Sequence, residues 1–359
     1  SLATKMAETP EQVLQFLRDL ASRSRPHAEQ DLAELRAFAA ERGCTDLQSW
    51  DVGYFSEQLR QHRYAISQEE LRPYFPVDTV INCAANVKHF SAGNDIEEVN
   101  VGGVLNLIDF CLASSARLVH VSTTSVSGFS IDGDPAPDTV MDEQMLYFGQ
   151  HLDNKYGHSK FRAERFILEN VSRGLKARIV RVGNLSARDS DGEFQINFTT
   201  NSFTGRLKSY LLIGKFPYSL INQPVEFSPI DTTAASILLL AGTPDGCSVF
   251  HSFNNHTVAL GDIIRQMQKM GLPVEIAESR EYEAALEMAE ADPEKARILS
   301  SLIAYRNKGH GRQIRPVPRS NEYTLQVLSR LGCQWPITSR EYMERFLQAL
   351  QGLGYFDEA

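Results

Sequence analysis

A cluster of hydroxyl side chains, followed further along by a tyrosine and a lysine, is the part of this sequence best suited to chemistry. The apolar run Leu118–Val121 leads directly into Ser122–Ser125, as a buried strand that delivers side chains to its carboxyl end would do. Tyr156 and Lys160 lie four positions apart, so a helix would place them on one face, a turn from each other. The spacing therefore predicts a strand end and a helix face that serve one site.

The residue types at this site fit the protonation of an oxyanion during hydride transfer. A neighbouring ammonium loosens the proton of a phenol, and a hydroxyl nearby can bind the carbonyl oxygen. We predict Tyr156 as the proton donor, Lys160 as the ammonium and Thr123 as the hydroxyl. Each residue alone has a plainer explanation, as a turn-capping hydroxyl, an interface tyrosine or a solvated lysine, and the combination is what favours catalysis.

Two other predicted strands end in small residues that suit a nucleotide ligand. Ala84 and Ala85 follow the strand Asp78–Cys83 and would let a ribose and a phosphate lie against the backbone. A later strand ends in three residues where a nicotinamide carboxamide would find main-chain hydrogen bonds: Val182, Gly183 and Asn184. Tight packing between strand and loop, or a plain turn, explains the same residues, and both explanations stay open.

Strand and helix patterns alternate from Val77 to Gly183. Apolar runs at Asp78–Cys83, Leu118–Val121 and Arg178–Val182 predict buried strands. A helix over Lys155–Val171 is expected between the last two. Another is expected to open at Asn100, with one apolar face formed by Val101, Val104, Leu105, Ile108 and Leu112. This order predicts an α/β fold with a Rossmann-like parallel sheet and crossover helices.

The pattern is looser after Gly183. An irregular stretch is expected as far as Pro229, before an apolar helix near 231–242 and a strand near 249–253. Further helices are expected near 259–270, 280–304 and 320–332, and over a last segment that begins at the cap Thr338–Glu341 and runs through Leu350. The carboxy-terminal part is therefore predicted to be mostly helical.

One motif that this fold needs is missing. A dinucleotide fold holds the pyrophosphate on backbone N–H groups of a glycine-rich loop directly after its first strand. No such loop precedes Val77, and Gly102-Gly103 lie inside a later helix. The sheet is thus expected to lack its first strands and this loop, which leaves Asp78–Cys83 as an exposed or helix-covered edge.

Composition excludes several classes of function. A formal charge of −9 argues against a nucleic-acid-binding protein and against binding to an anionic membrane. No apolar segment approaches the length of a transmembrane helix, and five scattered cysteines without a Cys-x-x-Cys pair fit a reducing cytoplasm. His251 and His256 lack an acidic partner, and His-Glu-x-x-His does not occur, so no metal site is expected.

Several segments after Val77 carry the resemblance to a known family. They are Val80-Ile-Asn-Cys-Ala-Ala-Asn-Val87, Asn100-Val-Gly-Gly103, Val119-His-Val-Ser-Thr-Thr-Ser125, Tyr156-Gly-His-Ser-Lys160, Arg181-Val-Gly-Asn-Leu185 and Phe227-Ser-Pro-Ile-Asp231. With them the chain resembles the thioester reductase domains of non-ribosomal peptide synthetases, which are extended short-chain dehydrogenase/reductases. The segment Arg181–Leu185 favours these domains over sugar-nucleotide epimerases.

The resemblance implies a substrate, a cofactor and a set of site residues. NADPH would reduce a peptidyl or aminoacyl thioester to an aldehyde, which some relatives reduce again to an alcohol. The substrate would be carried on the phosphopantetheine arm of a peptidyl carrier protein. Besides the small residues at the two strand ends, Asn100, Ser122, Tyr156 and Lys160 would contact the cofactor.

The first 76 residues resemble a different family. Ser1–Met6, Gln48–Asp51 and Leu71–Pro76 are similar to an internal helical stretch of oligopeptidase A and related thimet-type metallopeptidases. The matched part holds no metal ligand, so no peptidase function carries over. The chain is therefore predicted to be a chimera joined near Pro76–Val77. Its expected regions are a helical segment (1–76), an incomplete Rossmann-like reductase core (77–235) and a subdomain that faces substrate and carrier protein (236–359).

Two other functions stay open on the sequence. An extended short-chain dehydrogenase with the same catalytic residues would also suit a nucleotide sugar or another carbonyl compound, with Arg312 and Arg315 as candidates to bind the diphosphate. Alternatively, a fusion without a complete cofactor site would catalyse nothing. The missing glycine-rich loop is the observation that favours this second alternative.

Overall fold

The computed structural model describes residues 77–87, 93–152, 154–194, 201–244, 248–292, 295, 298–299 and 313–357. The predicted helical segment 1–76, the junction at Pro76 and much of the predicted helix 280–304 beyond Glu290 lie outside these ranges. None of the described helices is long and apolar enough to cross a membrane.

A four-stranded parallel sheet forms the centre of the described chain. Its strand order is β1-β2-β4-β9, and every neighbouring pair runs parallel. The strands are β1 (Thr79–Asn82), β2 (Arg117–Thr123), β4 (Lys176–Val182) and β9 (Ser248–Ser252). The predicted parallel sheet is confirmed, and β1 lies at its edge within the described residues, as expected for a sheet that lacks its first strands.

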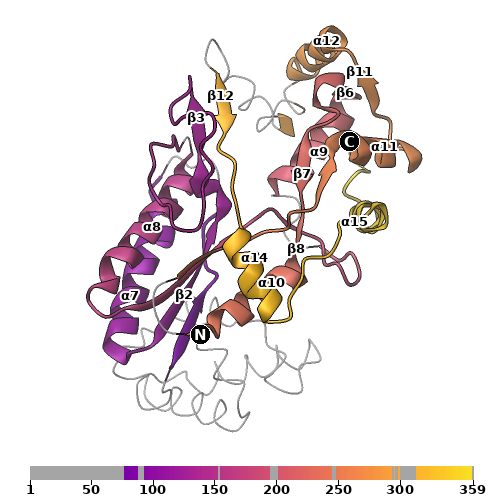
Figure 1. Ribbon diagram of the computed structural model, residues 1–359. Helices are drawn as coiled ribbons and strands as arrows, with labels where there is room; N and C mark the ends of the chain where they lie inside the picture. The colour runs from indigo at the N-terminus through magenta and orange to yellow at the C-terminus, as the bar shows by residue number, and fades with distance from the viewer. Residues whose placement is uncertain are drawn as a thin grey trace, which may run out of the picture.

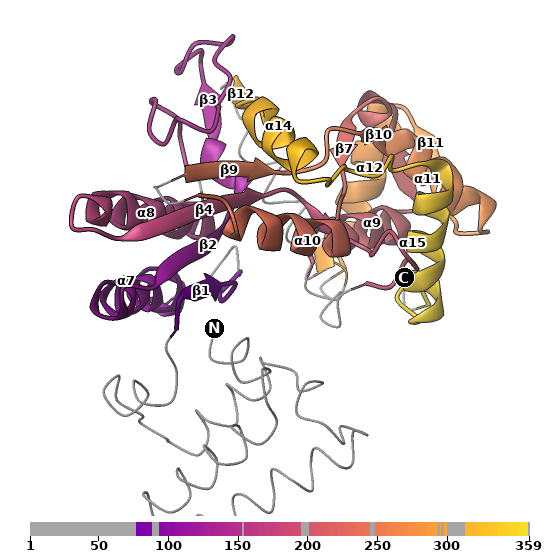
Figure 2. The ribbon, with the colours of Figure 1, turned by 60° about the horizontal axis from the view of Figure 1, so that its bottom comes forward.

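Helices cover both faces of this sheet, and the alternation of side chains along β2 explains why (Figures 1 and 2). Leu118 and Val119 are both fully buried, and they point to opposite faces. Leu118 packs in the cluster that includes α7 (Gly103–Ser114) and α8 (Lys155–Val171). Val119 packs with α10 (Ile230–Ala241) and α14 (Glu322–Arg330). Such coverage is typical of a buried parallel sheet.

The helix expected from Asn100 begins differently. A short α6 (Asp95–Glu97) passes into a π-helical turn, η2 (Glu98–Gly102), and only then into α7. Val101, Val104 and Ile108 are buried as predicted, but Leu105 is 37% exposed, so its assignment to the apolar face was wrong. The wider π turn rotates the following residues relative to a regular α-helix, and such turns often occur at functional sites.

A second apolar core lies beside the sheet and is built from four helices and short strand pairs (Figure 1). The helices are α9 (Ser202–Ile213), α11 (Leu260–Lys269), α12 (Ser279–Glu290) and α15 (Arg340–Gly352). The strand pairs are β6 (Lys215–Pro217) with β11 (Glu275–Ala277), β7 (Pro224–Glu226) with β10 (Thr257–Ala259), and β5 (Leu185–Ser186) with β8 (Ser228–Pro229). Buried aromatic rings such as Phe227 and Phe346, with centroids 5.7 Å apart, fill this core.

The stretch between Gly183 and Pro229 is not irregular as the sequence pattern predicted. It contains the helix α9, whose first turn is capped by the Asn201 side chain through the N–H groups of Phe203 (2.9 Å) and Thr204 (3.2 Å). Gly205 inside this helix lowers its intrinsic propensity and hides the helical pattern. The cap and the burial of Leu207 against the second core offset that deficit.

The chain passes between the two cores more often than one boundary at residue 235 allows. Strand β9, beyond that boundary, pairs with β4 in the central sheet. Helix α9, before the boundary, packs into the second core together with α15 residues near the carboxyl end. The two cores therefore each combine residues from both predicted regions.

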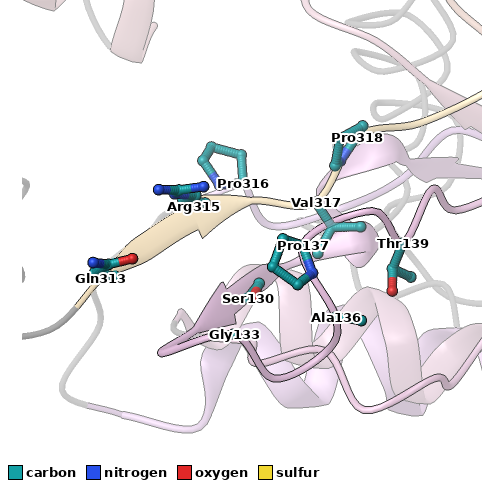
Figure 3. A pocket seen from close by; sticks show the side chains of 10 residues that line it. All are labelled: Ser130, Gly133, Ala136, Pro137, Thr139, Gln313, Arg315, Pro316, Val317 and Pro318. Carbon is teal, nitrogen blue, oxygen red and sulfur yellow. The ribbon is translucent and has the colours of Figure 1, made fainter.

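A two-stranded arm rises from the carboxyl end of the sheet. Strand β3 (Phe129–Ile131) pairs antiparallel with β12 (Ile314–Pro316), and the bonds Val317 N to Gly128 O (3.1 Å) and Met141 N to Pro318 O (2.9 Å) continue the contact. The two segments enclose a small hollow of about 40 Å³. Figure 3 shows the side chains that line it. Its volume suits a water molecule or two rather than a ligand.

Candidate active site

The last residue of β2 places a hydroxyl at the carboxyl end of the sheet. Thr123 closes the strand and caps the 3₁₀ turn η3 (Thr124–Ser127), with its side-chain oxygen accepting from the N–H of Ser125 at 3.1 Å. The Thr123 hydroxyl also lies 3.2 Å from Ser125 Oγ, and the residue is only 7% exposed. Extended strand geometry followed by a tight turn therefore fixes the position of this hydroxyl.

Helix α8 delivers the phenol and the ammonium to the same strand end. The Asn154 side chain accepts from the N–H of Gly157 at 2.6 Å and so starts the helix just before Tyr156. Lys160, one turn later, is 3% exposed, and its Nζ donates to the carbonyl oxygen of Val121 on β2 at 2.7 Å. The Tyr156 hydroxyl interacts with the Thr123 side chain. The structure thus brings Thr123, Tyr156 and Lys160 together.

Burial sets the protonation of this site. It lowers the pKa of Lys160 to about 8, while the charges of Glu164 and Cys83 act in the opposite direction. Burial also raises the pKa of Tyr156, against the hydrogen bond from Thr123. Tyr156 is therefore a protonated phenol at neutral pH and Lys160 is predominantly an ammonium. This is the state in which the phenol can donate a proton.

Asn100 connects the loop after β1 to helix α8. It lies in the π turn, is 1% exposed, and accepts from the N–H of Asn86 at 2.6 Å through Oδ1. Its Nδ2 donates to Asn86 O and to Ser159 Oγ, both at 2.9 Å. Because both amide hydrogens have partners within the protein, the side chain positions this loop and has no further donor for a ligand.

Ser122 was predicted beside the cofactor, and its side chain points into the protein. The hydroxyl donates to Oε1 of Glu164 at 2.5 Å, and the residue is 1% exposed. Along β2, Ser122 faces the side of the sheet that α8 covers, together with Leu118 and His120. The Ser122 side chain therefore holds helix α8 against the strand.

A network of buried charged side chains, which no sequence pattern brought together, links helix α8 to strand β4. The guanidinium of Arg181 binds both carboxylate oxygens of Glu164, at 2.7 to 3.1 Å, and its Nη1 lies 2.9 Å from Nε2 of His251. All three side chains are at most 1% exposed. The one available signal was Glu164 at four positions after Lys160, the spacing of neighbours on a helix face.

His251 is a neutral histidine buried in the core. Burial and the charge of Arg181 lower the pKa of His251 to about 4. Its Nδ1 lies 2.5 Å from the carbonyl oxygen of Ser320, which can only accept, so Nδ1 carries the proton. Nε2 is then free to accept from Arg181. Within the ranges described, no group of three potential ligands could hold a metal ion.

The end of β4 is closed by a buried carboxyl group. Glu226 accepts from the N–H of Asn184 at 2.9 Å and from the hydroxyl of Ser228. A Cβ atom on Gly183 would lie 2.5 Å from the Glu226 carboxylate, so only glycine allows this approach. The N–H of Gly183 already donates to Ser252 O at 3.3 Å. The donors expected to serve a nicotinamide carboxamide at Gly183 and Asn184 are therefore used within the protein.

The small residues after β1 remain accessible. Ala84 is exposed and Ala85 half-exposed, and the N–H of Ala84 donates to Asn82 Oδ1 at 3.1 Å. Together with Tyr156 and Lys160, these residues fit the ribose and nicotinamide end of a dinucleotide. In the described part of the chain, no glycine-rich turn from a strand into a helix is available for the pyrophosphate.

The amino-terminal part matches a peptidase family. A model of peptidase family M3 matches residues 1–89. Oligopeptidase A of Salmonella typhimurium and that of Escherichia coli are each 61% identical over 83 residues, which are 23% of this chain and 12% of the peptidase. This match covers only a small part of a much longer protein, in agreement with a chimeric chain.

The remainder matches reductases. A thiolation-reductase di-domain of an archaeal non-ribosomal peptide synthetase has 34% identity and a TM-score of 0.71, over 81% of this chain and 61% of that one. The reductase domain of an aureusimine biosynthetic cluster has 25% identity and a TM-score of 0.64, over 78% and 70%. Glycine betaine reductase of Emericella nidulans is 26% identical over 242 residues, which are 65% of this chain and 19% of that protein.

A family model also matches this part directly. It is described as male sterility protein, an NAD-binding family, and it matches residues 49–237, overlapping the peptidase match over 49–89. The predicted junction at Pro76–Val77 falls inside this overlap. Since the match includes 189 of 359 residues, the chain belongs to the NAD-binding family described as male sterility protein, with an amino-terminal segment related to oligopeptidase A.

Proposed function

We propose that this chain is an NADPH-dependent reductase that releases a carrier-bound peptidyl or aminoacyl thioester as an aldehyde. The observation that carries the proposal is the convergence of Thr123, Tyr156 and Lys160 at the carboxyl end of β2. The solved structures with 25% identity or more that were named above are reductase domains, which supports reduction as the reaction class.

The three residues have separate roles in this reaction. Thr123 donates a hydrogen bond to the thioester carbonyl oxygen, and Tyr156 protonates that oxygen as negative charge develops on it. Lys160 lies beneath the strand end, favours loss of the phenolic proton through its charge and binds the nicotinamide ribose. NADPH, when bound, supplies the hydride for the carbonyl carbon.

The reduction proceeds in two stages, hydride addition and then loss of the thiol. The carbonyl carbon gains a hydride and its oxygen gains the Tyr156 proton, which gives a hemithioacetal. The carbon–sulfur bond then breaks, the hydroxyl loses its proton, and the thiolate takes one up. The products are an aldehyde, a free thiol and NADP⁺, and one proton from solvent restores Tyr156.

The partner in this proposal is a peptidyl carrier protein whose phosphopantetheine arm brings the thioester to Thr123. The second core, with helices α9, α11, α12 and α15, lies beside the carboxyl end of the sheet and would form the substrate-facing side (Figure 1). The same catalytic residues would serve a nucleotide sugar, but Arg315, a residue suggested for its diphosphate, lies on the arm at the small hollow.

Two measurements test the proposal. A fluorescence titration with NADPH is expected to show micromolar binding, and absence of binding at millimolar concentration would mean a chain without a working cofactor site. Turnover is then compared between a peptidyl thioester, with aldehyde as the product detected, and a uridine diphosphate sugar. Faster turnover of the nucleotide sugar would overturn thioester reduction.

A further inference from the structure

An arginine from the far side of the sheet reaches the residue next to the catalytic threonine. Nη1 of Arg319 donates to Thr124 Oγ1 at 3.1 Å, although the two residues are 195 positions apart. The Arg319 guanidinium also lies over the ring of Phe253, 5.7 Å from its centroid. Phe253 follows β9 and Thr124 follows β2, so the arginine spans the end of the intervening strand β4.

The main chain holds Arg319 firmly in place. Arg319 pairs with Met141 in an isolated β-bridge, and the neighbouring bonds Met141 N to Pro318 O and Ser320 N to Met141 O are both 2.9 Å. Just upstream, the arm residues Pro316, Val317 and Pro318 pack against β3 and the turn after it (Figure 3). The arginine is thus positioned by a rigid segment rather than by its own side-chain contacts alone.

Most of the hydrogen-bonding capacity of this guanidinium is still available. It has five N–H donors, and within the described ranges the one side-chain hydrogen bond it makes is to Thr124. The residue is exposed, although it lies at the site. Burial raises the pKa of Glu226, and the nearby charge of Arg319 acts in the opposite direction, so a buried carboxyl group lies in the same neighbourhood.

The electrostatic setting favours a neutral acceptor over an anionic one. Glu226, 8% exposed and hydrogen-bonded to Asn184 and Ser228, opposes a second carboxylate beside Arg319. A neutral carbonyl oxygen meets no such repulsion and accepts a strong hydrogen bond from a guanidinium. Thr123 and Thr124 are consecutive, with Cα atoms about 3.8 Å apart. An acceptor bound by Arg319 would therefore belong to a part of the substrate near the carbonyl held at Thr123.

We propose that Arg319 is a specificity-determining residue that binds an amide carbonyl oxygen of the substrate close to the thioester. Such an amide occurs on the acyl side, in a peptidyl group, and on the thiol side, in the pantetheine arm. This inference rests on the proposed thioester substrate. Thr124 and Phe253 orient the guanidinium, and the buried Glu226 selects against acidic acyl groups.

The test measures binding without cofactor, so that it does not depend on turnover. Four thioesters are titrated by calorimetry: N-acetylaminoacyl and plain acyl groups, each on N-acetylcysteamine and on ethanethiol. We expect Arg319→Met to weaken at least one amide-containing thioester by about 10- to 100-fold, because a charge-assisted hydrogen bond is lost. The acyl ethyl thioester, which has no amide, should change less than about twofold. The thioester that loses affinity shows whether the amide that Arg319 binds lies on the acyl side or on the thiol side.

Further variants separate recognition from structure. Arg319→Lys keeps the charge without the planar fork and should be intermediate, and Arg330→Met on the exposed end of α14 is the matched control with no expected effect. Equal weakening of all four thioesters, unchanged binding of all four, or no binding by the parent chain would each overturn the role of Arg319. Parent protein that binds the amide-containing thioesters but fails to reduce them with NADPH would overturn the proposed function alone.

Discussion

The ends of the neighbouring strands β2 and β1 are built in different ways. At the end of β2, Lys160 is buried against the strand and Thr123 is fixed by a turn. At the end of β1, Cys83 and Ala84 are exposed, and the loop that follows is held by a hydrogen bond from the N–H of Asn86 to the Asn100 side chain. The groups proposed for proton transfer are thus anchored in the core, whereas the described sheet supplies little to hold the distant half of a dinucleotide.

This difference means that the proposed proton-transfer site and the proposed cofactor site are held by separate parts of the fold. The contacts of Lys160, Glu164 and Arg181 run from β2 through α8 and β4 toward β9, away from the edge strand. Loss of a unit on the outer side of β1 leaves these contacts in place. The carboxyl end of β2, with Thr123, Tyr156 and Lys160 around it, should therefore keep its geometry even if NADPH binds weakly.

Among the changes at the carboxyl end of β2, replacing Tyr156 should have the largest effect on activity. Tyr156→Phe removes the proton donor, and kcat is expected to fall by about 10²- to 10⁴-fold, while the NADPH dissociation constant stays within a small factor. Steady-state thioester reduction and the fluorescence titration measure the two quantities. Tyr147→Phe, at a tyrosine that is 75% exposed, is the control. An active Tyr156→Phe protein would remove Tyr156 from the mechanism.

Breaking the buried network of Glu164, Arg181 and His251 should lower the stability of the protein. Glu164→Gln leaves the charge of Arg181 buried without its partner, and the free energy of unfolding is expected to drop by about 3 to 5 kcal/mol. Urea unfolding measures this change. Glu169→Gln breaks an exposed pair with Arg165 and should cost at most about 1 kcal/mol. Equal effects of the two variants on the free energy of unfolding would show that the buried network does not stabilise the fold more than an exposed ion pair does.

The lowered pKa of Lys160 predicts opposite pH dependences for stability and activity. Between about 8 and 10.5 the unfolded chain binds a proton that the folded chain has lost, so the free energy of unfolding rises with pH, by about 3 kcal/mol at most. Thioester reduction should instead fall above about pH 8, where Lys160 loses its charge. Unfolding measured across this window should rise less steeply for Lys160→Met. Parallel curves for parent and variant would contradict the assignment.

Alanine substitutions at two glycines should change the free energy of unfolding by smaller amounts and in opposite directions. Gly183→Ala places a methyl group against the Glu226 carboxylate and Phe253 and should lower the free energy of unfolding by about 1 to 3 kcal/mol. Gly103→Ala, where no heavy atom lies within 4 Å of the added Cβ in helix α7, should raise it by about 0.4 to 1 kcal/mol. Thermal unfolding of both variants checks the signs. A stable Gly183→Ala protein would mean that the Glu226 contact yields easily.

The sequence predicted local structure well where one periodicity dominates. The helix Lys155–Val171 has the predicted bounds, and β1, β2 and β4 lie within a few residues of the predicted runs. It failed at α9, where Gly205 and a weak pattern hid a helix that the second core stabilises. It also misplaced Leu105, which lies beside the apolar face that Val104 and Ile108 form on α7.

The sequence by itself determined the residue types of the candidate site, since residues four positions apart, such as Tyr156 and Lys160, share a helix face, and Thr123 follows an evident strand. It also determined the absence of a glycine-rich loop before Val77. Only the tertiary structure decided which distant side chains complete the site. Glu226 meets Gly183 because β8 pairs with β5, and Arg319 meets Thr124 because the main chain at Arg319 pairs with Met141. No local pattern encodes pairs so far apart in the chain.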